Sequence, residues 1–212
     1  MSKNTKGNKI GLFIGIIIAV LAVAGVIGII YINKNKPKEE PTKEVKILNS
    51  IDEYGITLSD MDSSLYKEEY EVLKKNLLSD RINYKEYAES ISKLFIIDLY
   101  TLSTKLNKFD VGGSEVVYPP ILENYKVNVE DTLYKYLEDN SKGNRKQQLP
   151  KVKSIKVVST KEEKYKITSE DKTYDGYKIV LKWDYEKDLG YDTEATLNII
   201  KVDNKLYVVE KN

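Results

Sequence analysis

The longest uninterrupted run of apolar residues lies at residues 10–32, where no charged side chain occurs. A helix of this length is about 34 Å long, which is enough to cross a hydrocarbon core of about 30 Å. A cleaved signal peptide is the alternative, because Ala22-Val23-Ala24 matches the small-x-small cleavage pattern. However, the apolar region of a signal peptide normally ends after about 7 to 15 residues. We therefore expect residues 10–32 to form a transmembrane helix retained in the lipid bilayer.

The residues on either side of this segment bear on its orientation. Residues 1–9 form a short basic tail with three lysines and no acid, which is typical of a cytoplasmic start. A bare count of lysines favours the opposite orientation, because residues 33–44 are also rich in lysine. Long domains, however, are translocated largely regardless of charge. We expect a single-pass cell-membrane protein whose C-terminal part is extracytoplasmic.

Small residues recur at every fourth position within the apolar segment, at Gly11, Gly15 and Ala19, and again at Ala24 and Gly28. This spacing allows two membrane helices to approach closely, which would favour a homo-oligomer. The alternative is that Gly and Ala are simply common in membrane helices.

Residues 33–44 are charged, contain Pro37 and Pro41, and lack apolar side chains. They predict a flexible charged tether. Apolar residues return from Val45 onward, so residues 45–212 form one domain of ordinary size.

Helical spacing of apolar residues dominates the first half of this domain. It predicts three helices, over residues 63–77, 83–106 and 119–137. Asn83 with Glu86 forms a capping-box-like start for the second helix. Residues 114–118 could form a short strand. Residues 54–58 could form a strand or an extended docking segment.

The pattern changes after the polar loop at residues 140–148. Apolar and polar residues alternate over residues 177–185, which predicts a half-buried strand. Further strands are expected at residues 155–159, 195–199 and 206–209, with Asp203-Asn204 as the turn before the last. Residues 161–175 are charged and predict a loop, with a further short strand at residues 165–167 as the alternative.

Helices followed by a run of strands indicate an α+β fold. The full prediction is an N-terminal transmembrane helix, then about three helices packed on a curved antiparallel sheet of three to five strands.

Composition removes several kinds of chemistry. The chain has no Cys and no His, which excludes disulfides, thiol nucleophiles, a Ser-His-Asp triad and His-ligated metals. The net charge is only +1, and Arg81 and Arg145 are the only arginines. We expect no nucleic-acid partner, no metal and no cofactor.

Candidate catalytic residues are few. Asp98 interrupts the apolar face of the second helix and could be a general acid or base with a shifted pKa. A polar side chain on an open helix face is the commoner explanation, so we assign no catalytic residue. Acid pairs such as Glu162-Glu163 lack calcium-loop spacing. Gly112-Gly113 and residues 188–191 are predicted to be turns.

Tyrosine is unusually frequent, with 17 residues. Tyr suits half-buried surfaces and protein interfaces, and it also stacks on sugars or bases. Ordinary core packing explains most of these residues, and a Tyr-rich interface is the main alternative.

The order of elements, with residues 95–102 as part of a long helix, resembles the cone-shaped fold typified by nuclear transport factor two. Together with residues 10–32 and the tether, it resembles the bitopic assembly-factor family of conjugative type IV secretion systems. The resemblance implies a non-enzymatic component of an envelope-spanning assembly that contacts other envelope proteins. No functional residue can be carried over. The alternative expectation is an exported ligand-binding or sensing domain.

Overall fold

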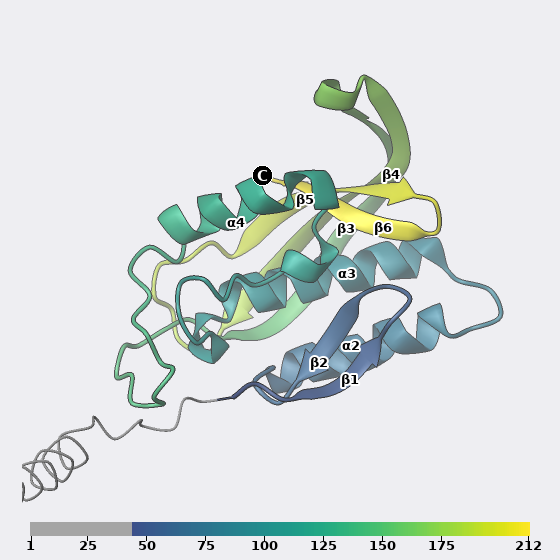
Figure 1. Ribbon diagram of the computed structural model, residues 1–212. Coiled ribbons are helices and arrows are strands. Elements are labelled where there is room, and N and C mark those ends of the chain that lie inside the picture. The colour runs from purple at the N-terminus through teal and green to yellow at the C-terminus, as the bar shows by residue number, and fades with distance from the viewer. Residues whose placement is uncertain (1–43) are drawn as a thin grey trace, which may run out of the picture. The chain divides into compact units, whose positions relative to one another are not determined.

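The computed structural model describes residues 44–212. The predicted basic tail, the predicted transmembrane helix and all but the last residue of the predicted tether lie outside the described residues. Within residues 44–212, none of the helices has the length and apolar character needed to cross a membrane. This part of the chain is α+β, with three α-helices and two antiparallel sheets (Figure 1), which confirms the expected class.

A two-stranded hairpin opens the domain. Strands β1 (Ile47–Ile51) and β2 (Ile56–Ser59) pair in antiparallel fashion across a turn in which Gly55 has a φ of 70°. A strand or docking segment was predicted at residues 54–58, and residues 56–58 lie in the second strand of this hairpin. The first strand was missed because most of its side chains are exposed.

The two long helices begin where their capping residues predict. Helix α2 spans Ser64–Leu77 and α3 spans Tyr84–Tyr100. The Ser63 hydroxyl accepts a hydrogen bond from the Tyr66 amide at 3.2 Å, and the Asn83 side chain accepts one from the Glu86 amide at 3.2 Å. Each cap satisfies one of the free N–H groups of the first helical turn.

Helix α3 ends six residues earlier than predicted. Thr101 leaves the helix with a ψ of 68°, and a 3₁₀ turn, η1 (Leu102–Thr104), follows it. The Thr101 hydroxyl accepts a hydrogen bond from the amide of Val152, at the start of the main sheet. Leu102 remains buried at 1% exposure. The apolar spacing therefore continues past Thr101 although the helix does not.

The third helix, α4 (Leu122–Asp131), is also shorter than predicted. It follows two 3₁₀ turns, η2 (Ser114–Val116) and η3 (Pro119–Ile121). After Asp131 the chain forms irregular turns in which Tyr134 is fully buried. The short strand expected at residues 114–118 is instead η2 and a single parallel bridge between Val117 and Val208.

The main sheet has four antiparallel strands in the order β3-β4-β5-β6. They are β3 (Val152–Ile167), β4 (Lys172–Tyr185), β5 (Glu194–Val202) and β6 (Lys205–Lys211). Helix α3 packs on β3, β4 and β6, and α2 packs on α3. The buried alternation of Ile179, Leu181 and Trp183 in β4 confirms the strand predicted at residues 177–185.

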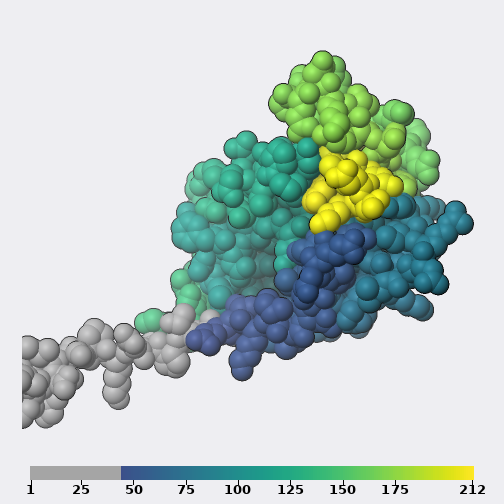
Figure 2. Space-filling model, turned by 45° about the vertical axis from the view of Figure 1, so that its right-hand side comes forward, coloured from purple at the N-terminus to yellow at the C-terminus, as the bar shows by residue number. Residues whose placement is uncertain are grey.

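Residues 161–175 are not the predicted loop, although the short strand expected at residues 165–167 does lie within a strand. They belong to the ends of β3 and β4, which are joined by the 3₁₀ turn η4 (Thr168–Glu170). Strand β5 pairs with β4 only from Gly176 to Lys182, so residues 161–175 of the β3–β4 hairpin extend beyond the sheet (Figures 1 and 2). We call these residues the arm. Most side chains of the arm are exposed, so the apolar alternation of a half-buried strand is absent.

Candidate functional site

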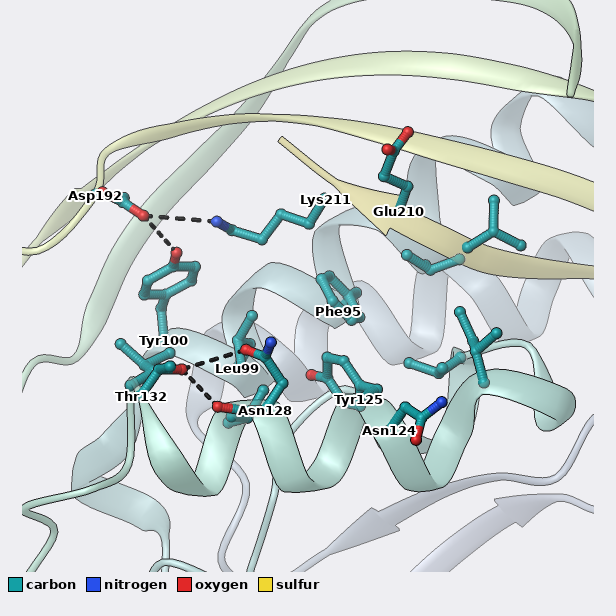
Figure 3. A pocket seen from close by; sticks show the side chains of 16 residues that line it. Phe95, Leu99, Tyr100, Asn124, Tyr125, Asn128, Thr132, Asp192, Glu210 and Lys211 are labelled. Atoms are coloured by element: carbon teal, nitrogen blue, oxygen red, sulfur yellow. Dashed lines mark hydrogen bonds and ion pairs between the residues drawn. The ribbon is translucent and has the colours of Figure 1, made fainter. Parts of the chain in front are cut away.

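A groove of about 640 Å³ lies between α4 and β6, with α3 beneath it (Figure 3). We call it the α4–β6 groove. Its floor is apolar. Phe95 and Leu99 of α3 contribute from below, and Val117 and Val208 contribute at the end where the bridge joins η2 to β6. All four residues are buried in the protein. An apolar floor of this kind favours binding of apolar groups from a partner.

Helix α4 forms one wall of the groove. Asn124, Asn128 and Thr132 follow one another at four-residue spacing, so they lie on one side of the helix and its end (Figure 3). Asn124 and Asn128 are exposed, and the Thr132 hydroxyl donates to the Asn128 carbonyl at 2.6 Å. Each Asn carboxamide offers both a donor and an acceptor at the groove.

Tyr125 fixes α4 on the rest of the domain. Its hydroxyl donates to the carbonyl of Gly112 at 2.5 Å, and its ring lies 5.8 Å from the ring of Phe95. Burial raises the pKa of Tyr125 well above its usual value, so the hydroxyl stays protonated as a donor. The wall therefore has a defined position relative to the floor.

A charged cluster closes the other end of the groove. The Tyr100 hydroxyl donates to the Asp192 carboxylate at 2.8 Å, and the Lys211 ammonium lies 3.5 Å from the same oxygen (Figure 3). Burial and the hydrogen bond to Asp192 raise the pKa of Tyr100. On β6, the Glu210 carboxylate accepts a hydrogen bond from the side-chain amide of Asn198 at 2.5 Å. The charged groups at this end are thus already paired.

Asp98, the candidate acid or base, does not line this groove. One oxygen of its carboxylate forms an ion pair with Lys105, and the other accepts from the Gly113 amide at 2.7 Å. Burial lowers the pKa of Lys105, but Asp98, Asp110 and Asp62 raise it by more, so the ammonium stays charged. We interpret Asp98 as a structural residue that joins the end of α3 to the turn at Gly113.

The two turns predicted from glycine positions lie where they were expected. Gly112-Gly113 forms a turn that lies close against α3. A Cβ on Gly112 would lie 2.2 Å from the Asp98 carbonyl oxygen, so the turn requires glycine at this position. Residues 188–191 lie in the connection between β4 and β5. Within residues 44–212, no group of three or more acids is arranged to hold a metal ion.

Tyrosines contribute mainly to the core. Tyr70, Tyr87 and Tyr134 are among the largest fully buried side chains, whereas Tyr136 is 79% exposed. Tyr118 and Tyr174 form a smaller cluster with Ile200, and their hydroxyls contact Glu170 at the tip of the arm. Packing therefore accounts for most of the Tyr-rich pattern, and Tyr100 and Tyr125 are the tyrosines that line the groove.

The sequence alone gives no signal for the groove. Its lining comes from α3, α4 and β6, which lie far apart in the chain, and Asn124 and Asn128 look like ordinary polar residues of a surface helix.

Comparisons of this chain with protein-family models, with curated proteins and with solved structures give no match. The resemblance to the secretion-system assembly factors stays a prediction from the order of elements.

Proposed function

We propose that this protein is a single-pass membrane-anchored, non-enzymatic component of an envelope assembly, and that its extracytoplasmic domain binds other envelope proteins through the α4–β6 groove. Residues 10–32 supply the anchor and residues 33–44 the tether in this proposal. The order of elements resembles that expected for the bitopic assembly factors of conjugative type IV secretion systems, which is consistent with the same role.

The observation that carries the proposal is the composition of the groove. An apolar floor at Phe95 and Leu99 lies beside exposed carboxamides at Asn124 and Asn128. Protein-binding surfaces combine an apolar centre with a polar rim in this way. The charged group at its end, Asp192, is engaged by the Tyr100 hydroxyl and the Lys211 ammonium.

Anchoring strengthens such a contact. A domain held at a membrane by a short tether meets partners in the same membrane at a high effective concentration. Contacts that are weak in solution can then hold an assembly together.

A second function, binding of a small exported ligand, is favoured by the size of the groove. Its volume of about 640 Å³ lies within the range of about 300–1,000 Å³ that is usual for small-molecule sites. This function requires a compact ligand and no partner protein.

The experiment is cross-linking in native membranes followed by purification of the full-length protein. Asn128→Trp should fill the groove, whereas Glu123→Trp places the same side chain on α4 at a position that does not line it. We expect co-purifying envelope proteins to be lost in the Asn128 variant and kept in the Glu123 variant.

Equal recovery of the same proteins with both variants would remove the groove from the proposal. Recovery of the wild-type protein alone, together with a rise in its melting temperature on adding a small molecule, would favour the second function.

A further inference from the structure

Strand β6 is an edge strand of the main sheet. It pairs with β5 on one side, and no strand within residues 44–212 pairs along its other side. An open strand edge presents N–H and C=O groups that can pair with another extended chain. Here that edge is also one wall of the α4–β6 groove, since Val208, Val209, Glu210 and Lys211 line it.

The chain starts a fifth strand beside β6 and then leaves it. Val117 forms a parallel bridge with Val208, and the amide of Tyr118 donates to the Val208 carbonyl at 3.0 Å. Pro119 and Pro120 follow at once and turn the chain into α4. Both prolines lack the N–H that a continuing strand would need. Beyond Val208, the open edge of β6 therefore faces the groove and no segment of residues 44–212 pairs with it.

The backbone groups of Lys211 point into that place. Thr196 of β5 and Asn212 exchange two hydrogen bonds, at 2.8 and 2.9 Å, so they form a hydrogen-bonded antiparallel pair. Hydrogen-bonded and non-hydrogen-bonded pairs alternate along antiparallel strands. The next pair along the two strands, Lys211 with Leu197, is therefore a non-hydrogen-bonded pair. The N–H and C=O of Lys211 must then point away from β5, toward the open edge.

We propose that the α4–β6 groove binds an extended segment of a partner protein, which adds to the main sheet as a strand beside residues 208–211 of β6. The inference rests on the proposed function and specifies the form of the bound partner. The four residues from Val208 to Lys211 extend over about 10 Å, at about 3.3 Å per residue step, which matches a segment of about four residues.

The two walls complement such a segment. Its backbone pairs with Lys211 on one side, and the carboxamides of Asn124 and Asn128 face it on the other. Side chains of a strand alternate in direction, so every second residue of the segment meets the apolar floor at Phe95 and Leu99. The partner segment is therefore extended and alternates apolar with polar residues.

The test uses displayed random heptapeptides selected on the full-length protein in lipid nanodiscs. Peptides that bind are then measured on two variants. Lys211→Pro removes the outward N–H, which an edge strand tolerates, whereas Lys211→Ala removes the side chain and keeps the N–H. We expect affinity to fall about five- to tenfold with the proline variant relative to the alanine variant, the effect of one backbone hydrogen bond.

Hydrogen exchange supplies a second measurement that does not depend on the folding of the proline variant. In the wild-type protein, a bound peptide should slow exchange of the Lys211 amide about tenfold or more. Equal affinity of the two variants, or unchanged exchange at Lys211, would overturn strand addition. If Asn128→Trp still abolished partner recovery in that case, the groove would remain the binding surface and only the strand form of the partner would be wrong.

Discussion

The ammonium of Lys105 lies against the carboxylate of Asp98, although α3 ends between the two residues. The Lys105 side chain is only 8% exposed and the Asp98 side chain 21%. The pair joins the end of α3 to the segment that leads toward the groove wall at α4.

Replacing Lys105 with Met should leave the Asp98 carboxylate mostly buried without its partner. We expect the free energy of unfolding to fall by about 3 kcal/mol. The measurement is urea unfolding of the full-length protein, followed by the fluorescence of Trp183, the only tryptophan. The double variant with Asp98→Asn should recover much of the loss, because no uncompensated charge is left. A double variant as unstable as the single one would contradict this interpretation.

Gly176 should not tolerate a side chain. A Cβ at this position would lie 1.8 Å from the carbonyl oxygen of Ile199, so β4 and β5 would have to separate. We expect Gly176→Ala to lower the free energy of unfolding by about 3 kcal/mol. Gly143→Ala is the control, because its Cβ meets nothing within 4 Å and only its φ of 70° is unfavourable. That variant should lose about 1 kcal/mol. Similar losses for both would contradict the close approach.

Stability should fall at alkaline pH because of the buried tyrosines. Burial raises the pKa values of Tyr66, Tyr125 and Tyr134 well above the value of about 10 that applies in the unfolded chain. The unfolded chain then releases protons at a pH where the folded chain keeps them. Stability is fully present below about pH 10 and is lost as the pH rises above it. When the pH is raised, the absorbance of the tyrosinates formed by these three residues should appear in the same transition as the change in Trp183 fluorescence that reports unfolding. Titration of all 17 tyrosines near pH 10 with the fold intact would contradict this prediction.

The orientation of the proposed anchor can be measured directly, because the chain has no Cys. A single cysteine at Lys161, which is exposed on β3, should react with a membrane-impermeant maleimide in intact cells. A single cysteine at Ser2 should react only after the cells are permeabilised. The reverse pattern would place the domain in the cytoplasm.

Local signals in the sequence predicted the starts of the helices and the centre of the sheet. Ser63 and Asn83 cap their helices through contacts within one turn, and the alternation at Ile179, Leu181 and Trp183 reflects one buried face. The ends of helices were less predictable. Leu102 is still buried at a helical spacing after α3 has ended. The helix ends at Thr101, whose hydroxyl accepts a hydrogen bond from the amide of Val152, 51 residues away, and no local pattern shows this contact.

The groove and the Asp98–Lys105 pair needed the folded chain. Phe95, Asn128 and Lys211 meet only because α3, α4 and β6 pack together, and no pattern within any one of them indicates a site. The spacing of Asp98 and Lys105 would place them on one side of a continuous helix, but they meet through the turn after Tyr100.

The hairpin at the start of the domain has a mechanical consequence. A force applied at residue 44 acts on the end of β1 that lies opposite the hairpin turn, where the Asp60 amide donates a hydrogen bond to the Lys46 carbonyl. The hydrogen bonds between β1 and β2 would then break one after another rather than together. Strand β2 would stay in place, because Glu115 accepts hydrogen bonds from the amide and hydroxyl of Thr57. Ile51 is buried in the core at 6% exposure, so peeling would stop there and release about 20 Å of chain from residues 44–50. The domain thus carries a reserve of length that tension can draw out while α2, α3, α4 and the main sheet stay folded.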